Sequence, residues 1–205
     1  MTAGAGAPLT PDRRLQDGRT QDGRALGDTA QKLIAAAAAE FNEHGFAGTD
    51  TNRIARRAGF APQTFYRWFV DKIEIFIRVY DAWQIEEARA LAPLLAEGAP
   101  DAEVAAAAVA HHRAYLPFRR SLRQLSLEHP QVRAARAASR LRQIERIRLG
   151  QGARALDAAV LAPWLLEMER LSDALAEGEI EDMGLDPEVT RGELAGIIGR
   201  IRRGG

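Results

Sequence analysis

Side chains that bind phosphates and base edges are concentrated in one short stretch of this chain, between residues 49 and 72. Glutamine can pair bidentately with adenine and arginine with guanine, whereas lysine and hydroxyl groups mostly bind backbone phosphates. The whole chain has no net charge, but residues 52–72 carry five basic side chains against the single acid Asp71, a local charge of +4. Neutralised phosphates release condensed counterions, so such a local patch favours a nucleic-acid partner.

Residues that could support catalysis are not arranged for it. The chain has no cysteine to act as a nucleophile. Its four histidines form no HExxH pattern, and the adjacent His111 and His112 would point about 100° apart on a helix. The sequence also lacks a phosphate-binding loop and a dinucleotide fingerprint. We therefore expect no catalytic residue, no metal site and no cofactor.

The basic stretch must be positioned by two short helices around a tight turn. Ile54 and Ala58 share one face of a first helix, which Thr49 can cap with its hydroxyl. Gly59 stands where the chain leaves that helix through a left-handed residue, and Pro62 presets φ for the next helix. This pattern predicts a helix-turn-helix, which makes double-stranded DNA the leading candidate for a partner.

The second helix has an apolar face and a polar face. Phe65 and Phe69, four residues apart, form its buried side. Off that line, toward solvent or a DNA groove, lie Thr64, Tyr66, Arg67 and Trp68. The alternative interpretation is a solvated helical hairpin with a few arginines, which leaves the register of the turn residues and phenylalanines unexplained.

This segment resembles the DNA-binding domain of the tetracycline-repressor (TetR) family of bacterial regulators, over roughly residues 25–80. The resemblance is carried by Leu33–Phe41, His44-Gly-Phe46, Gly48-Thr49, Ile54-Ala55, Ala58-Gly59-Phe60, Thr64–Phe69 and Asp71-Lys72. It implies a transcriptional regulator, most often a repressor, that binds a near-palindromic DNA operator as a homodimer and responds to a small-molecule effector.

The resemblance also implies which residues contact DNA. It assigns phosphate contacts to Tyr66, Trp68 and Lys72, contacts at or near base edges to Gln63, Thr64 and Arg67, and flanking contacts to Thr49, Thr51 and Asn52. Two positions depart from the family pattern: Ala61 stands where a serine or another helix cap is usual, and Trp68 where histidine or tyrosine is more common. A lost cap costs about 1 kcal/mol, so the second helix should fray more in free protein.

Helical periodicity continues after this segment without strand-like alternation, so the predicted fold class is all-α. We expect a disordered tail at 1–24, a three-helix helix-turn-helix domain at 25–72, and a helical effector-binding and dimerisation domain at 73–205. Capping boxes at Asp28 and Asp71 predict the starts of the first helix and of a long connecting helix, which Pro93 should end or kink. Further helices are expected at about 101–116, 118–128, 130–149, 153–177 and 187–202.

Charge is segregated in the second half of the chain. Residues 119–154 contain ten arginines and two acids, whereas residues 167–193 contain ten acids and two arginines. We expect these helices to be neighbours that pair their charges, within one subunit or across a dimer. A second DNA-binding surface on the arginine-rich segment is the weaker alternative.

The resemblance implies a ligand pocket among the helices of the second domain. The candidates to line it are Trp83, His112, Tyr115, Phe118, Trp164 and Met168, and for each of them plain core packing is the alternative. The last helix carries an apolar stripe that would be a liability on a monomer. We therefore expect a dimer interface made of Leu194, Ile197, Ile198 and Ile201 with Leu161, Leu165, Met168 and Leu175.

No apolar run approaches the ~20 residues that a membrane helix needs. The absence of cysteine suits a reducing compartment, so we expect a cytoplasmic protein with no membrane partner. The alternative function is a helical ligand- or partner-binding protein whose helix-turn-helix is only structural, and an enzyme is a third class. Salt separates the first two, because a DNA binder loses affinity steeply with added salt and an apolar-ligand binder hardly at all.

Overall fold

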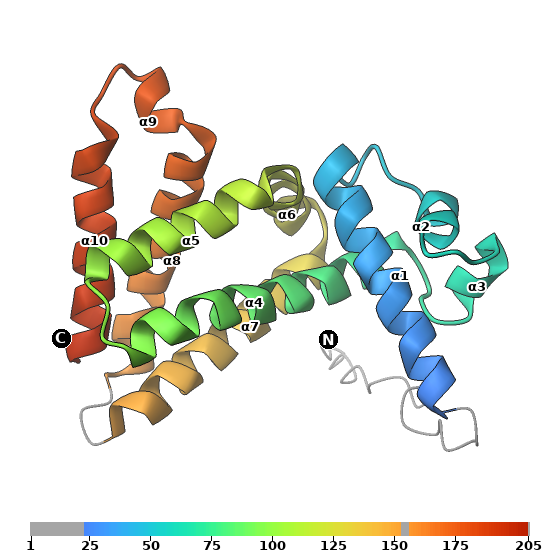
Figure 1. Ribbon diagram of the computed structural model, residues 1–205, viewed down its shortest axis with the longest axis horizontal. Helices are drawn as coiled ribbons and strands as arrows, with labels where there is room; N and C mark the ends of the chain where they lie inside the picture. Colours follow the sequence, from blue (N-terminus) through green and yellow to red (C-terminus); the bar gives the residue numbers. More distant parts are fainter. Residues whose placement is uncertain (1–22, 153–155, 205) are drawn as a thin grey trace, which may run out of the picture.

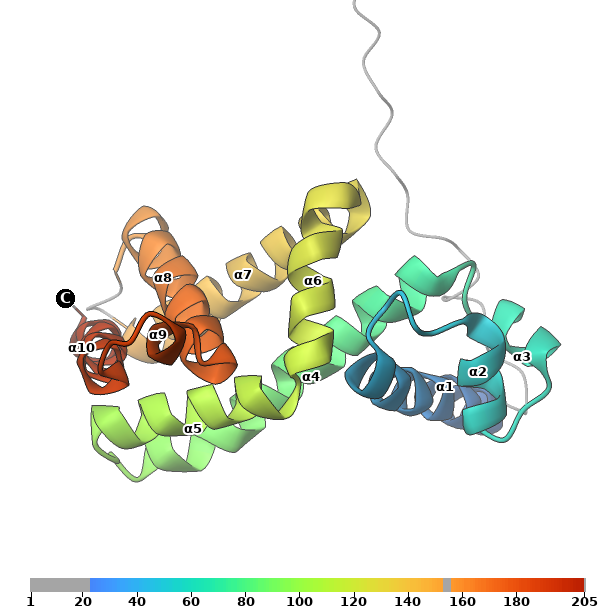
Figure 2. The ribbon, with the colours of Figure 1, turned by 90° about the horizontal axis from the view of Figure 1, so that it is seen from above.

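The computed structural model describes residues 23–152 and 156–204, and every regular element within them is a helix. Helices α1–α3 form one end of the molecule, α8–α10 form the other, and α4 runs between them (Figure 1). A view from above shows α6 and α7 beside α4 and α5 (Figure 2). The bounds are α1 Gly23–His44, α2 Thr51–Arg57, α3 Pro62–Tyr66, α4 Lys72–Ala96, α5 Asp101–Ala114, α6 Leu116–Glu128, α7 Pro130–Gln151, α8 Ala158–Glu177, α9 Glu179–Asp182 and α10 Pro187–Arg203. The predicted all-α fold is confirmed.

Helix α1 begins earlier than its capping pattern indicates. It starts at Gly23, so Asp28 lies inside the helix and the predicted start there is wrong. A capping pattern is a local signal, and it does not prevent the preceding residues from being helical. Residues 1–22 of the expected tail lie outside the described residues, whereas residues 23 and 24 belong to α1.

Helix α4 begins where the sequence predicts and ends later. The Asp71 carboxylate caps it by accepting a hydrogen bond from the backbone N–H of Glu74 at 2.8 Å. Pro93 does not end the helix, which continues to Ala96 and stops before Gly98, at φ 71°. Pro93 lies on the exposed side, where water can replace the hydrogen bond that proline removes.

The later helices agree with the predicted segments apart from their ends. Helices α5 and α6 are separated by a single residue, Tyr115, and α7 extends to Gln151. Helix α8 begins at Ala158 with Asp157 as its cap, and residues 153–155 lie outside the described part of the chain. The short α9 was not predicted; it follows Gly178, whose φ of 81° ends α8.

One hydrophobic core crosses the expected domain boundary at 72/73. The Phe76 ring on α4 lies 5.1 Å from that of Phe41 on α1 and 5.0 Å from that of Phe118 on α6. Helix α6 is also tied to the end of α1, because the Ser121 hydroxyl accepts a hydrogen bond from the Phe46 N–H at 2.9 Å. The first three helices are therefore continuous in packing with α4 and α6.

The apolar stripe of α10 is buried inside the subunit. Leu194 and Ile197 are completely buried, and Ile198 is 5% exposed. The stripe packs against residues of α5 and α8 such as Val104 and Leu165. The predicted dimer interface at this stripe is therefore wrong, because helical spacing identifies a buried face but not the surface that buries it. The partner residues expected on α8 belong to the same subunit's core.

A buried arginine joins α6 to α8. The Arg119 side chain is 1% exposed and donates to the Asp173 carboxylate at 2.9 and 3.0 Å and to Glu169 at 2.7 Å. Arg136 and Arg140 on α7 also bind Glu169. The predicted pairing of the two charged segments is thus confirmed within one subunit for Arg119, Arg120, Arg123, Arg136 and Arg140. Arg142 and Arg148 instead bind acids outside the acidic segment, and Arg154 lies outside the described residues.

A histidine extends this ion-pair network to α4 and α5. His112 Nδ1 lies 2.8 Å from Asp173 Oδ1, and its Nε2 lies 3.2 Å from Glu87 Oε1. Burial disfavours the charged ring, but the bonds to Asp173 and Glu87 outweigh it and raise the pKa of His112. Burial likewise opposes the charged form of Glu169, yet the arginines Arg119, Arg136 and Arg140 lower its pKa to about 2.

Stability should therefore fall on both sides of a mildly acidic optimum. The raised pKa of His112 means that its contribution is complete below about 6.5, its unfolded value, and is lost as pH rises through the higher folded value. The lowered pKa of Glu169 gives a contribution that is complete above about 4.5 and is lost as pH falls toward 2. Urea unfolding from pH 3 to 9 measures both limbs. His112→Gln should flatten the alkaline limb alone, and an unchanged alkaline limb in that variant would contradict the assignment.

Candidate nucleic-acid interface and ligand cleft

The first helix of the predicted helix-turn-helix is capped by Asp50. Its carboxylate accepts a hydrogen bond from the Arg53 N–H at 2.8 Å, and α2 begins at Thr51. The predicted cap Thr49 is wrong: its hydroxyl donates to the carbonyls of Glu40 and Gly45, at 3.1 and 2.9 Å. Thr49 therefore fixes the turn after α1, which places the cap one residue later.

The turn between α2 and α3 has the predicted geometry. Gly59 adopts φ 81°, which side chains disfavour, and leads the chain out of α2. Pro62 occupies the first turn of α3, and the residue before it, Ala61, is the N-cap without a side-chain hydrogen bond. Phe65 on α3 and Phe69 are both buried as predicted, but α3 ends at Tyr66, so Phe69 follows the helix instead of lying on it.

The outer side of α3 presents most of the predicted DNA-contacting side chains to solvent. Gln63, Arg67 and Asn52 are exposed, and Tyr66 is 60% exposed. The Tyr66 hydroxyl lies 3.0 Å from that of Thr51, which joins the two helices at this surface. Thr51, Thr64 and Trp68, in the same helix-turn-helix, are half-buried.

Two of the predicted contact residues are turned inward. Thr49 is 2% exposed, with its hydroxyl engaged as described above. The Lys72 ammonium donates to the carbonyls of Phe46 and Thr49 at 2.8 and 2.7 Å and lies 4.0 Å from the centre of the Phe46 ring. Burial lowers the pKa of Lys72. These contacts stabilise the turn after α1 and leave little of either side chain for a phosphate.

The basic patch is also weaker than the sequence count indicates. Arg53 and Arg57 bind Glu40, and Arg57 also binds Glu43, both on α1. The two acids reduce the local charge from +4 to +2. Arg56 makes no ion pair among the described residues and is exposed, so it is a better candidate for a phosphate than either neighbour. Counting charges along residues 52–72 did not reveal these ion pairs, because the two acids lie on α1.

Residues 33–79, which contain α2, the turn and α3, match the family model described as bacterial regulatory proteins, tetR family. This segment therefore matches the DNA-binding region of the TetR family. The match covers the helix-turn-helix and the start of α4, and the family it describes consists of bacterial regulatory proteins. No curated protein matches the chain at a significant level.

Solved structures of TetR-family and other regulators share the fold over nearly their whole length. A TetR-family transcriptional regulator from Rhodococcus sp. is 17% identical, with 86% of this chain and 99% of that chain covered and a TM-score of 0.64. A second, from Mesorhizobium loti MAFF303099, is 20% identical, covering 89% and 97%, with a TM-score of 0.56. The fatty acid degradation regulator FadR from Bacillus halodurans is 16% identical, covering 83% and 94%, with a TM-score of 0.52.

The helices after α3 enclose a cleft of about 670 Å³, which lies between α4, α5, α7, α8 and α10. Of the six predicted pocket residues, only Met168 lines it. Trp83, His112 and Phe118 are buried in the core instead, and Tyr115 donates to Glu86 at 2.7 Å. The Trp164 ring stacks with the Arg200 guanidinium. Those five residues do not line this cleft, because they pack against the core or bind neighbouring side chains.

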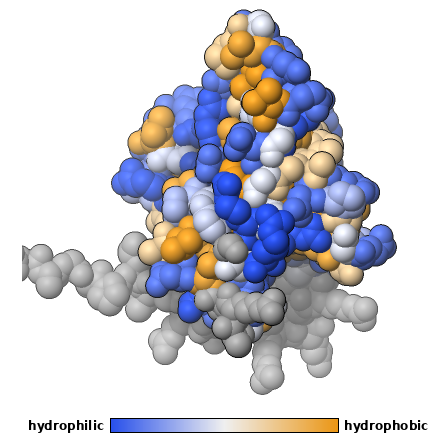
Figure 3. Space-filling view, turned by 90° about the vertical axis from the view of Figure 1, so that its left-hand side faces the viewer, coloured by the Kyte–Doolittle hydropathy of each residue, from blue (hydrophilic) through white to orange (hydrophobic). Residues whose placement is uncertain are grey.

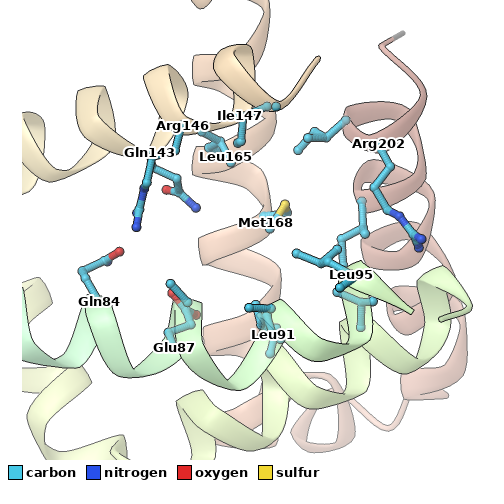
Figure 4. A pocket seen from close by; sticks show the side chains of 18 of the residues that line it. Gln84, Glu87, Leu91, Leu95, Gln143, Arg146, Ile147, Leu165, Met168 and Arg202 are labelled. Carbon is cyan, nitrogen blue, oxygen red and sulfur yellow. The ribbon is translucent and has the colours of Figure 1, made fainter. Parts of the chain in front are cut away.

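Apart from Met168, the residues that form the cleft were not predicted as pocket residues from the sequence. Figure 4 shows Gln84 and Glu87 on α4 facing Gln143 and Arg146 on α7, with Met168 on α8 behind them. Most of the remaining wall is apolar and comes from Ala88, Leu91, Ala92, Leu95, Ala96, Val104, Ala108, Ile147, Leu165, Ile198 and Ile201. Helical periodicity placed these residues on the apolar faces of their helices, but it did not show that the faces enclose a cleft.

The described part of the chain contains neither a candidate metal site nor a membrane-spanning helix. Within it, no group of three or more histidine or acidic side chains is placed to hold a metal ion. The same residues include no helix long and apolar enough to cross a membrane.

The uncapped start of α3 allows a direct test of the local geometry. Ala61→Ser should raise the free energy of unfolding by about 0.5–2 kcal/mol, because the hydroxyl can accept a hydrogen bond from a free N–H of the first turn. Urea unfolding of the full chain measures the change. Ala47→Ser, in the exposed turn after α1, is the matched control and should have little effect. Equal stabilisation by both variants would show that the cap is not the cause.

Proposed function

We propose that this TetR-family regulator is a repressor that binds a near-palindromic DNA operator as a homodimer and releases it when an effector enters the cleft. The observation that carries the proposal is the outer side of α3, where Gln63, Tyr66 and Arg67 project to solvent from a helix seated on buried phenylalanines. A helix held in this way can enter the major groove. The protein acts by binding alone, without catalysis, in the cytoplasm.

The proposed contacts divide into two kinds. Gln63, Arg67 and Thr64 read base edges, because amide and guanidinium groups match the donor and acceptor pattern of the major groove. Phosphates are held by Tyr66 and Trp68, by Thr51 and Asn52 at the start of α2, and by Arg56. Thr49 and Lys72 support this surface from within and are not among the contacts.

Selection of bound sequences from a random DNA pool should enrich an inverted repeat. Arg67→Ala or Gln63→Ala should relax preference at particular base positions, by about 1–3 kcal/mol for a bidentate contact. Arg56→Ala should weaken binding to all sequences equally and lower the salt slope by about one unit. Arg89→Ala, on the exposed side of α4 in the second domain, is the control and should change neither quantity. Enrichment of no sequence, with binding insensitive to salt, would defeat the DNA-binding proposal.

The outer faces of α8 and α10 are the proposed dimer surface. Val160 and Leu166 on α8 are 40% and 57% exposed, and Val189 on α10 is 71% exposed. A Cβ added at Gly192 or Gly196 would meet nothing within 4 Å, so this side of α10 is open to close approach. Figure 1 places α8 and α10 at the end opposite α3, so pairing there leaves both recognition helices free.

The exposed apolar groups on this end of the molecule support the same assignment. Seen from the side of α10, apolar groups lie among hydrophilic ones, most plainly at the top, around α9 (Figure 3). Met183 and Leu185, which follow α9, are 57% and 60% exposed. Exposed apolar groups gathered near one end of the molecule support an interaction surface there.

Leu166→Asp should therefore dissociate the dimer without unfolding the subunit. We expect at least a tenfold weaker dimer in sedimentation over a range of concentrations, with a free energy of unfolding changed by about 0.5 kcal/mol or less, as for other exposed positions. Leu141→Asp, at an equally exposed leucine on α7, is the matched control. Ile198→Asp should instead unfold the protein, because it buries a charge. A dimer that is indifferent to Leu166→Asp would contradict the interface.

A further inference from the structure

The polar side chains of the cleft that still have free hydrogen-bonding groups lie together, at the end of the cleft formed by Gln84 and Gln143. There, Gln84 donates to Tyr80 through Nε2 and keeps its carbonyl free, while Gln143 accepts from Arg140 through Oε1 and keeps its amide N–H groups free. Arg146 stands beside Gln143 on the same helix (Figure 4). This end of the cleft can therefore hold a polar group of a bound molecule.

The polar groups at the other end are already committed. Gln151 donates to the Ile201 carbonyl at 2.6 Å and accepts from the Leu156 N–H at 3.1 Å. Arg202 donates to the Ala99 carbonyl and to Asp101, at 2.7 and 2.5 Å. Because Asp101 matches the charge of Arg202 and the Gln151 amide is bonded at both its nitrogen and its oxygen, the surface most available to a ligand at this end is apolar.

Arg146 is a cation without a partner among the described residues. Its neighbours on α7 are paired: Arg140 binds Glu169, Arg142 binds Asp81, and Arg148 binds Glu145. The acid of the cleft, Glu87, is bonded to His112 and does not leave an unmatched negative charge beside the opening. The charge left to be matched at this end of the cleft is therefore positive.

We propose that the effector is an aliphatic carboxylic acid, with its carboxylate on Arg146 and the Gln143 amide and its chain along the apolar wall toward Ile201. This proposal rests on the proposed function, because it names the chemical class of that function's effector. A guanidinium binds a carboxylate through paired, charge-assisted hydrogen bonds, so it selects the acid over a neutral or cationic head group of equal length. The apolar wall discriminates between ligands by the length of their aliphatic chain.

Calorimetric titration of the full chain, without DNA, tests the class of ligand. The probes are decanoate, 1-decanol and decylamine, each below its micelle-forming concentration. Decanoate should bind at least tenfold more tightly than the alcohol, and the amine most weakly. Across straight-chain acids from six to twelve carbons, affinity should rise about fourfold per methylene until the cleft is full, because each buried CH₂ contributes about 0.8 kcal/mol. Equal affinity for decanol and decanoate would overturn the proposal.

Variants of α7 locate the head group. Arg146→Gln should weaken decanoate about 10- to 100-fold and decanol little, because it removes a hydrogen bond between charged groups. Arg146→Lys should keep part of the affinity, since the charge remains but the paired geometry is lost. Arg148→Gln, at a paired arginine that does not line the cleft, is the matched control. Arg146 is exposed, so these variants should fold. Unchanged decanoate binding in Arg146→Gln would also overturn the proposal.

DNA release is measured separately, which keeps the two proposals apart. If decanoate binds through Arg146 but leaves the operator complex intact, the ligand class stands and the proposed regulation fails. If the operator is bound but no acid of the series binds, the ligand class fails and the DNA-binding function stands.

Discussion

Two consecutive residues of α6 hold the two halves of this protein together. Phe118 packs against Phe76 in the core shared with α1, and Arg119 is buried in ion pairs with α8. Burying a guanidinium is costly unless carboxylates surround it, so α8 must present Asp173 and Glu169 where α6 meets it. The Nη1 group of Arg119 has no hydrogen-bond partner among the described residues. The guanidinium carbon lies 4.7 Å from the centre of the Trp83 ring, over its face. The packing of α6 against α8 must keep these ion pairs intact.

The same contacts connect the cleft to the helix-turn-helix. In the proposed mechanism, a ligand beside Glu87 acts on the residue that bonds His112, and His112 shares Asp173 with Arg119. From there the aromatic core leads through Phe118 and Phe76 to Phe46 at the turn after α1. These contacts supply a physical route, but the free energy for release must come from the ligand's differential affinity for two conformations.

The turn after α1 shows how the proposed DNA-binding surface depends on residues that are turned inward. Lys72 binds the carbonyls of Phe46 and Thr49, and the Thr49 hydroxyl binds two further carbonyls of the same region. These bonds fix the backbone just before Asp50, which caps α2. Support of the backbone therefore accounts for Lys72 and Thr49, and the proposed recognition surface consists of exposed residues of α2 and α3.

The sequence by itself determined the all-α fold and the register of the helix-turn-helix. These features follow from local spacing: a glycine at positive φ, a proline in the first turn of α3, and phenylalanines four residues apart. Only the tertiary structure decided which apolar stripe is covered, which cations are already paired and where the cleft lies. The Ile198 stripe faces its own subunit, Arg57 meets acids from α1, and the cleft walls come from five helices. Periodicity specifies which side of a helix is buried, whereas the partner that buries it depends on packing between segments far apart in the chain.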